Sequence, residues 1–484
     1  MTIDTAVRPS SPRIPMIRGR GSSARATQRP RIVTAVLIGS AFLAGAELFI
    51  VNVAFDEIGR YFAGAELSEL SWILNAYAVV YAALLVPMGG LADRFGQKRA
   101  FVAGLSVFVA ASLACGFAPG IWWLVAFRAL QAAGAAAMTP ASLGLLLAVV
   151  APEKRVRAAR LWATVGGLAA ALGPALGGGL VQASWQWAFW INLPIGLVLV
   201  FAALRYVPDV RLNRGTPKPD LAGAGLLVLA VGALVLGLVQ GGDWGWTSMP
   251  VLGTFAVCVL AIAAFGCRVL RHPAPIIPPA LLAVPAFRWA NLATLVYSTA
   301  FGTALLAAIL SLQQTWQLGA LHTGLAIAVG PLAAPIASVL AHRLFPGARP
   351  ARMIALGSLL LAGSALWQAW TLSSTPAFWT GFLPAWVLAG IGVGLVMPNL
   401  LAAATATLPP TQASTGGGVV TMARQVGLAL GVSVLVTIVG GAQGQAGFTY
   451  AWYAVALGML LTALTALRVP SVITAKPQPV PVAA

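Results

Sequence analysis

The chain has 484 residues, of which 59% are hydrophobic and 8% are charged, and its formal net charge is +18. Soluble globular domains are about a quarter charged, so this composition excludes a soluble protein and indicates an integral membrane protein. In a soluble chain such an excess of Lys and Arg would suggest a nucleic-acid partner. Here these residues fall mainly between long apolar runs, so no nucleic acid is expected.

Apolar runs long enough for a helix to cross a bilayer core of about 30 Å recur along nearly the whole sequence. A transmembrane β-barrel would instead show alternating segments of about ten residues. We therefore predict an all-α integral membrane protein. Its fourteen predicted helical spans lie at about 32–53, 72–92, 100–117, 121–150, 159–181, 187–203, 221–240, 250–267, 289–312, 321–340, 353–372, 378–401, 417–439 and 448–467.

The distribution of basic residues predicts the orientation of these spans. All but three of the 29 Lys and Arg residues lie before the first span, in every second connection or in the C-terminal tail; the exceptions are Arg60, Arg128 and Arg424. Because cytoplasmic loops collect Lys and Arg, both termini are predicted to be cytoplasmic. Richness in Ala, Gly and Arg is compatible with a bacterium of high GC content, so we expect the bacterial inner membrane.

Two polar or Pro-rich connections divide the spans into groups of six, two and six. They are "RYVPDVRLNRGTPKPD" after the sixth span and "RHPAPIIPPALLAVPAF" after the eighth. Paired six-helix bundles around a midplane site are a common transporter plan. We predict a disordered cytoplasmic tail (1–31), a six-helix bundle (32–204), a linker with two extra helices (205–288), a second six-helix bundle (289–468) and a cytoplasmic tail (469–484).

Two predicted spans carry opposite charges in their interior. The first contains Glu47 and Asn52 in "AELFIVNVAF", and the fourth contains Arg128 and Gln131 in "WLVAFRALQAAG". A charge inside a span is costly and is functional by default. The two spans run in opposite directions, which places Glu47 and Arg128 each about 10 Å below the outer surface at the helical rise per residue.

We therefore hypothesise that Glu47 and Arg128 form one proton-coupling unit. Burial favours the neutral form of a carboxyl group and a nearby cation favours its ionised form, so a changing distance to Arg128 would let Glu47 take up and release a proton. The alternative is a static pair that only fixes helix packing.

A charged connection, "GGLADRFGQKRA", follows the second span. Asp93 stands at the cytoplasmic end of a helix, where its charge opposes the helix dipole and requires a cation or a helix N-terminus nearby. Gly96 supplies a turn without a side-chain penalty. The candidate gate residues are Gly89, Asp93, Arg94, Gly96, Lys98 and Arg99. The alternative is a cluster that only sets the topology.

Other stretches combine glycine, proline or polar residues inside spans. The fifth span has Gly173, Pro174, Gly177 and Gly178 in "LGPALGGG", which predicts a kinked and tightly packed helix. The sixth contains Asn192, and the thirteenth contains Arg424 and Gln425. Arg424 is predicted roughly two turns from the cytoplasmic side, where it either closes a gate or extends to the interface.

Together these stretches resemble the major facilitator superfamily, specifically its fourteen-span drug:proton antiporter branch, from about Gly45 to the last span. The connection after the second span is similar to the family's G-x-L-A-D-R-x-G-[RQ]-K, and the fifth span fits the G-P-x-x-G-G of its exporters. The first span departs from the branch, because Glu47 stands where the pattern has Asp. The resemblance implies the major facilitator fold and a cytoplasmic latch at the Asp93 cluster in the outward-facing state.

The resemblance also implies proton-driven efflux of drugs or toxic small molecules by alternating access. The alternatives are an exporter of one endogenous metabolite or antibiotic, and a proton-coupled nutrient symporter on the same fold. Expected partners are a hydrophobic or cationic small molecule, protons and the lipid bilayer, with the chain acting as a monomer.

We expect no enzyme activity, cofactor or metal. The three histidines show no catalytic or metal-ligand spacing, and the three cysteines show no close pairing suited to a metal or redox site. None of the four lysines follows a glycine, so a G-x-x-x-x-G-K-[ST] phosphate loop is absent from the sequence.

Overall fold

The structure is a computed structural model that describes residues 30–470 apart from 63, 210–218, 374, 407, 409 and 443. The described residues form helices and no strand. Fourteen of the helical segments are long and apolar enough to cross a membrane, which confirms the predicted number of spans. Most of the two predicted tails and the middle of the linker after the sixth span lie outside the described residues.

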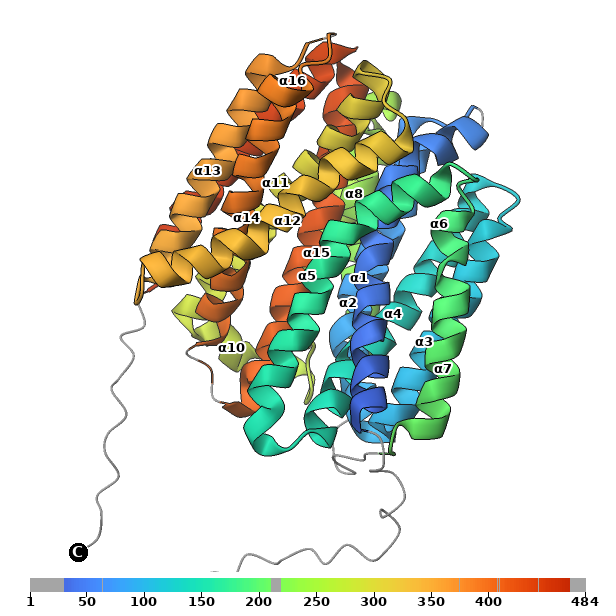
Figure 1. Cartoon of the computed structure of the whole chain (residues 1–484), viewed down its shortest axis with the longest axis vertical. Helices are drawn as coiled ribbons and strands as arrows, with labels where there is room; N and C mark the ends of the chain where they lie inside the picture. The colour runs from blue at the N-terminus through green and yellow to red at the C-terminus, as the bar shows by residue number, and fades with distance from the viewer. Residues whose placement is uncertain are drawn as a thin grey trace, which may run out of the picture.

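The first seven helices form what we call the N-terminal bundle (Figure 1). They are α1 (Pro30–Tyr61), α2 (Leu67–Phe95), α3 (Gln97–Gly116), α4 (Ile121–Val149), α5 (Arg155–Val181), α6 (Trp187–Trp190) and α7 (Asn192–Tyr206), with α6 and α7 together making one span and a short 3-10 turn, η1 (Pro152–Lys154), before α5.

What we call the C-terminal bundle begins after a short helix, α10 (Pro279–Ala283). It contains α11 (Pro285–Leu310), α12 (Ala320–Leu344), α13 (Pro350–Thr371), α14 (Leu383–Thr405), α15 (Pro410–Gly441) and α16 (Gln445–Leu467), and two π-helical turns, η2 (Ser311–Thr315) after α11 and η3 (Phe378–Phe382) before α14. We call the end of the molecule where α1 begins and α16 ends the inner end, and the opposite end the outer end.

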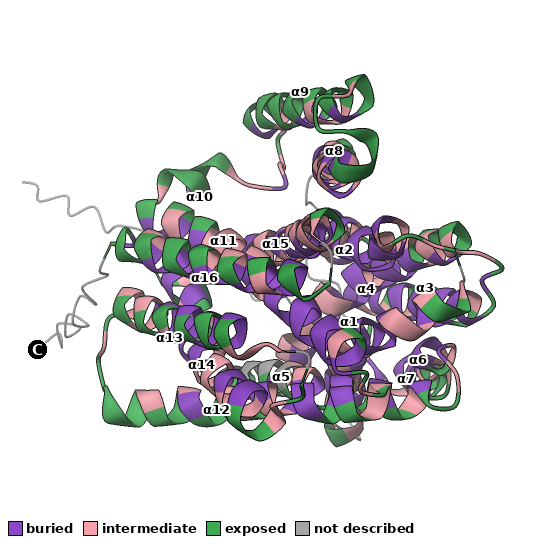
Figure 2. Cartoon of the chain, turned by 90° about the horizontal axis from the view of Figure 1, so that it is seen from above, coloured by how far each residue is buried: buried purple, intermediate pink, exposed green. Residues whose placement is uncertain are grey.

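The two extra helices lie at the edge of the molecule and not between the bundles (Figure 2). Helix α8 (Leu221–Trp244) packs beside α2 and α15, and Thr437 of α15 donates a hydrogen bond to the Leu238 carbonyl at 2.6 Å. Helix α9 (Met249–Arg271) packs on α8, and Arg268 Nε pairs with Asp220 Oδ1 at 2.5 Å. Asp220 also accepts the Gly223 amide hydrogen bond and so caps α8.

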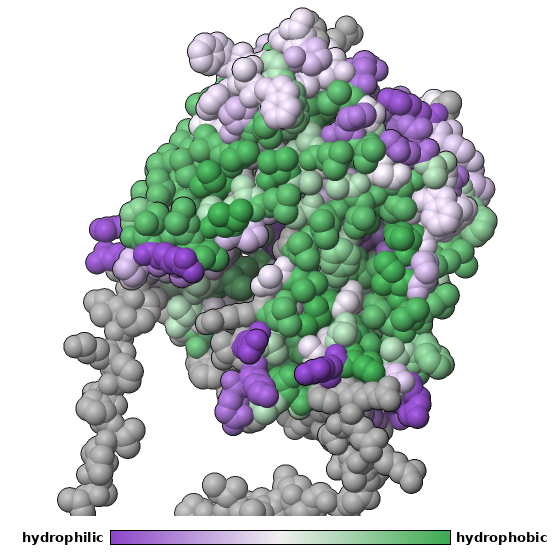
Figure 3. Space-filling model, in the orientation of Figure 1, coloured by the Kyte–Doolittle hydropathy of each residue, from purple (hydrophilic) through white to green (hydrophobic). Residues whose placement is uncertain are grey.

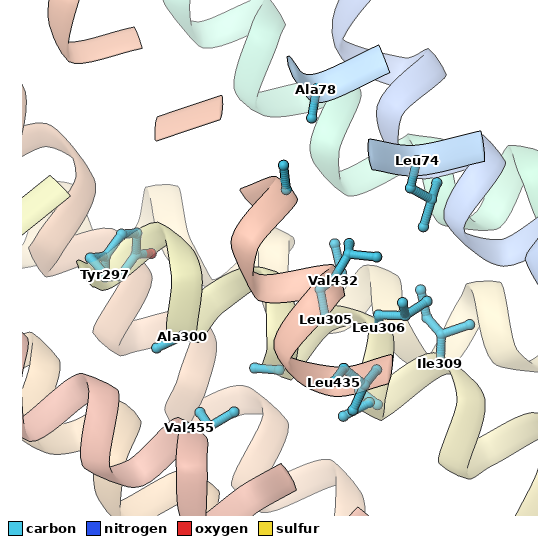
Figure 4. Close-up of a cluster of buried hydrophobic side chains, with 14 of the residues drawn as sticks. Leu74, Ala78, Tyr297, Ala300, Leu305, Leu306, Ile309, Val432, Leu435 and Val455 are labelled. Carbon is cyan, nitrogen blue, oxygen red and sulfur yellow. The ribbon is translucent and has the colours of Figure 1, made fainter. Parts of the chain in front are cut away.

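The surface shows a wide apolar band with hydrophilic residues near both ends (Figure 3), as a bilayer requires. Inside, a continuous apolar core joins the two bundles. Leu74 and Ala78 of α2 lie in the same buried cluster as Leu306 of α11 and Val432 of α15 (Figure 4). Burial of such side chains contributes roughly 25 cal/mol per Å² in water, but in a membrane close packing takes over that role.

Two helices extend beyond the apolar spans predicted for them. Helix α1 continues to Tyr61, eight residues past the predicted end at Val53, because Asp56 and Arg60 pair across one helical turn at 2.6 Å. Helix α15 begins at Pro410, seven residues before the predicted start. Hydropathy detects apolar membrane segments, whereas a helix also continues through the polar residues beside them.

Candidate functional site

Glu47 and Arg128 meet inside the N-terminal bundle. Arg128 Nη1 lies 2.7 Å from Glu47 Oε1, and both side chains have a solvent-exposed fraction of 0%. Helix α1 supplies the carboxylate and α4 supplies the guanidinium. A buried pair of this kind is stable only when further hydrogen bonds satisfy the remaining polar atoms of both groups, so the partners around it decide what it can do.

Three polar side chains complete a network around the Glu47 carboxylate. Gln131 of α4 donates to Glu47 Oε1 at 2.9 Å and to Ser112 Oγ at 2.7 Å, and its own Oε1 accepts from Arg128. Asn192, the first residue of α7, donates to Glu47 Oε2 at 2.5 Å and to Ser112 Oγ at 3.3 Å. Both carboxylate oxygens are therefore hydrogen-bonded, and four helices of one bundle meet at a single acid.

Helix α2 holds the guanidinium of Arg128 from the other side. Arg128 Nε donates to the Ile73 carbonyl at 3.1 Å, and the guanidinium carbon lies 4.2 Å from the centre of the Tyr77 ring. A cation over an aromatic face is attracted by the ring quadrupole. Tyr77 in turn stacks on Tyr81, one turn along α2, with ring centres 5.9 Å apart and planes 8° apart.

The sequence placed Gln131 and Asn192 only among other intramembrane polar residues, and it missed Ser112, Tyr77 and the Ile73 carbonyl. Ser and Tyr are ordinary in membrane helices, so their presence gave no signal. The structure does not bring Asn52 into this network, since its amide donates to the Leu48 carbonyl of its own helix at 2.6 Å.

The predicted gate cluster lies at the inner end, where α2 meets α3. Gly96 adopts φ +109°, a conformation suited to glycine, and it forms the turn between the two helices. The half-buried Asp93 accepts a hydrogen bond from Gln97 Nε2 at 2.6 Å, and Lys98 Nζ donates to the Leu204 carbonyl of α7 at 2.9 Å.

The remaining members of the predicted gate cluster surround this turn. Gly89 lies on the α2 face that packs on Pro140 of α4, Arg94 stacks beside Phe95, and Arg99 is exposed. These contacts connect helices of the N-terminal bundle with one another.

The glycines of α5 bring helices into close contact. A side chain at Gly173 or Gly177 would collide with α1, at Phe49 and Ala46 or at Ile50. Gly178 lies against the Ala320 carbonyl, where α12 of the other bundle begins. Pro174, inside α5, presents its carbonyl oxygen to Gly324 of α12.

The outer ends of the two bundles are thus joined. Figure 1 shows α5 and α12 side by side toward the outer end and diverging toward the inner end. Two glutamines of η2 add contacts that sequence reasoning missed: Gln313 Nε2 donates to the Val53 carbonyl at 3.1 Å, and Gln314 Nε2 lies 3.4 Å from Asp56 Oδ1. Glutamine beside an apolar span gave no signal from sequence that it would reach another bundle.

Arg424 stands 14 residues after the first residue of α15, or about 21 Å along the helix. Its two predicted roles, closing a gate or extending to the interface, stay predictions. Gln425 beside it is buried, and its Oε1 has no hydrogen-bond partner among the described residues.

Comparison with known proteins places the chain in a family. Residues 37–432 match the family described as Major Facilitator Superfamily. The chain belongs to the major facilitator superfamily. It is therefore a multi-pass membrane transporter of small molecules and not an enzyme, and the fold predicted from its motifs is confirmed.

Relatives within the superfamily cover most of the chain. It is 33% identical over 442 residues to the methylenomycin A resistance protein of Streptomyces coelicolor, covering 90% of this chain and 91% of that protein. It is 32% identical over 377 residues to the tetracenomycin C resistance and export protein of Streptomyces glaucescens, covering 77% and 69% respectively.

A solved structure shows the same fold at low identity. A POT family transporter in complex with a thioalcohol-conjugated peptide superposes with a TM-score of 0.67 at 15% identity, covering 89% of this chain and 94% of that chain. This likeness extends the major facilitator fold over both bundles and carries no information about the substrate.

Proposed function

We propose that this transporter exports drugs or other toxic small molecules across the bacterial cytoplasmic membrane by alternating access, in exchange for protons. Relatives named for resistance and export support the direction of transport. The single observation that carries the proton coupling is the fully buried Glu47–Arg128 pair, whose acid is hydrogen-bonded from Gln131 and Asn192.

A proton on Glu47 would change the balance of this cluster. Protonation removes the negative charge and leaves Arg128 as a buried cation with only neutral partners. An uncompensated buried charge costs several kcal/mol, so the protonated cluster favours a rearrangement of α4 relative to α1 that gives Arg128 a better environment. Release of the proton restores the pair. Glu47 is the proton carrier in this scheme, and Arg128 is the group that senses its charge.

Alternating access requires two closed ends that open in turn. In this structure α5 and α12 meet at the outer end, with Gly178 and Gly324 at the contact, which supports a path closed to the outside. The Asp93 cluster then acts at the inner end in the opposite state. We place the termini in the cytoplasm, as the basic residues predict, and we take the chain to act as a monomer made of the two bundles and the linker helices.

The test is drug accumulation in cells that express the wild type or Glu47→Gln, with Glu153→Gln as a matched control because Glu153 is an exposed acid outside the network. The panel contains methylenomycin A, tetracenomycin C and ethidium, each measured with and without a protonophore. We expect the wild type and Glu153→Gln to lower the accumulation of at least one compound, and Glu47→Gln or the protonophore to abolish the effect.

Two results would contradict the proposal. Efflux by Glu47→Gln at the wild-type rate would show that the proton is carried elsewhere. Higher accumulation in the wild type than in cells without the transporter would show import, and would favour the nutrient symporter on the same fold. A hydrophobic substrate agrees with this apolar interior.

A further inference from the structure

Three ionisable side chains of the Asp, Glu, Lys and Arg type lie deep inside the described spans: Glu47, Arg128 and Arg424. The first two form an ion pair and compensate each other. The other acids among the described residues stand near helix ends or in connections. They are Asp56 and Glu57 near the end of α1, Glu66 and Glu69 at the start of α2, Asp93 near its end, Glu153 in η1, Asp209 after α7, and Asp220 and Asp243 at the two ends of α8, with Asp220 paired with Arg268. The interior of the described molecule therefore carries one uncompensated charge, and it is positive.

Arg424 lies where the two bundles meet. Helix α15 touches α2 on the outer side of Arg424, where Asn75 Nδ2 donates to Ser433 Oγ at 3.3 Å, and it approaches α2 on the inner side, where Gly418 faces Val86. Arg424 stands between these two levels. Arg424 Nε is buried, so this part of the guanidinium packs against protein and not against lipid.

Polar atoms around Arg424 lack partners within the described part of the chain. Arg424 Nε and Tyr297 Oη are both buried without a hydrogen bond. Arg424 as a whole is only half-buried despite its depth, so the rest of its guanidinium borders accessible space. Buried polar atoms are normally satisfied, and leaving them unpaired is costly. A group that offers acceptor oxygens here would relieve this cost.

The chemistry of these atoms selects the ligand. A guanidinium only donates hydrogen bonds and matches the two oxygens of a carboxylate in a fork geometry. Tyr297 and Phe301 stack with ring centres 5.9 Å apart and offer an apolar surface beside the charge. The Glu47 carboxylate, which a cationic drug would need, already accepts hydrogen bonds at both of its oxygens.

We propose that Arg424, together with Tyr297, binds the carboxylate or a similar oxyanion of the transported molecule, so that this transporter handles organic acids with an apolar body in preference to cations. The inference rests on the proposed function for its biological meaning, but the binding site can be tested without transport. It favours an anionic substrate with an apolar body over the cationic alternative expected from sequence, because the Glu47 carboxylate is already hydrogen-bonded within its own cluster.

The test is equilibrium binding to the purified full-length protein in detergent. The probes are three acid and amide pairs that differ only in the charged group: benzoate and benzamide, 2-naphthoate and 2-naphthamide, and indole-3-acetate and indole-3-acetamide. Hydrogen bonds to a charged group contribute about 1.5–3 kcal/mol, so at least one acid should bind about tenfold or more tightly than its amide. Arg424→Gln should lose this preference and Arg424→Lys should retain most of it.

Arg343→Gln is the matched control, because Arg343 is exposed in the last turn of α12 at the inner end and its loss should leave the acid preference intact. Size-exclusion elution and circular dichroism report whether each variant is folded. If the wild type binds no acid better than its amide in any pair, or if folded Arg424→Gln keeps the preference, the proposed site is wrong.

Transport in inside-out vesicles separates this inference from the proposed function. Proton-driven uptake of the bound acid by the wild type, lost in Arg424→Gln, supports both. Acid binding that depends on Arg424, without uptake of the acid or of ethidium, supports the site and contradicts export. Uptake of ethidium that is equal in the wild type and Arg424→Gln, with no acid binding, supports export and overturns the oxyanion site.

Discussion

The Glu47–Arg128 pair makes a quantitative prediction about stability. The two side chains are completely buried and 2.7 Å apart, and removing one partner of such a pair leaves an uncompensated charge that costs about 3–5 kcal/mol. The loss of stability in Glu47→Gln should lie near the lower limit of this range, because Arg128 keeps its contacts with the Ile73 carbonyl and the Tyr77 ring. The double variant Glu47→Gln/Arg128→Gln lacks both charges of the pair. Its free energy of unfolding should be higher than that of either single variant by about 2 kcal/mol or more.

The two single variants should also differ in their dependence on pH. A carboxyl group left without its cation can escape the penalty by taking up a proton, whereas a guanidinium keeps its proton in proteins. In Arg128→Gln the folded state then binds more protons than the unfolded state, so its stability rises as the pH falls. The loss in Arg128→Gln should therefore shrink at mildly acidic pH, and the loss in Glu47→Gln should not.

Equilibrium unfolding in mixed micelles with increasing sodium dodecyl sulfate, followed by circular dichroism at neutral and mildly acidic pH, measures these differences. The double-mutant cycle isolates the pairwise interaction from the individual losses. The reasoning is refuted if the losses of the two single variants add up in the double variant. It is also refuted if both single variants respond to pH in the same way.

Two further predictions concern the outer end. Gly324→Val should stop transport without loss of expression, because a side chain there meets the Pro174 carbonyl and separates α12 from α5. Gly363→Val, on an open face of α13, is its control. Normal transport by Gly324→Val would contradict the contact. Cysteines at positions 56 and 314, joined by a short cleavable thiol reagent, should hold the outer end closed. Transport should stop on cross-linking and return on reduction, and transport that continues in the cross-linked protein would show that these contacts do not open.

The meeting of Glu47 and Arg128 was predictable because the direction of each span and the helical rise fix depth. The rotation of a helix about its own axis is set by packing, which hydropathy does not report. Ser112 and the Ile73 carbonyl could therefore not be assigned to the network. Asn192 was noted as an intramembrane polar residue, but its contact with Glu47 depends on how α7 begins after α6.

Hydropathy reports neither the first turns of α15 nor the packing of the linker helices. The segment "PTQASTGGG" (410–418) is too polar for a hydropathy window, yet it forms the first turns of α15. The helix that carries Arg424 therefore begins before the predicted span. Likewise, the linker helices are central in the sequence, but contacts such as Thr437 to Leu238 hold α8 beside the bundles. Sequence order alone does not determine on which side of a bundle an inserted pair packs.

Helix α2 connects the two charged sites of the molecule. Tyr77 covers the guanidinium of Arg128 and stacks on Tyr81 of the same helix. The same helix forms contacts with α15 of the other bundle through Asn75 and Val86. Loss of charge on Glu47 would act on α2 through Arg128, and arrival of an anion at Arg424 would act on α15, which packs on α2. Energetic coupling between two sites requires an element with two arrangements that both sites can bias. Helix α2 is the simplest candidate for that element, and its displacement would couple the Glu47 site to the Arg424 site.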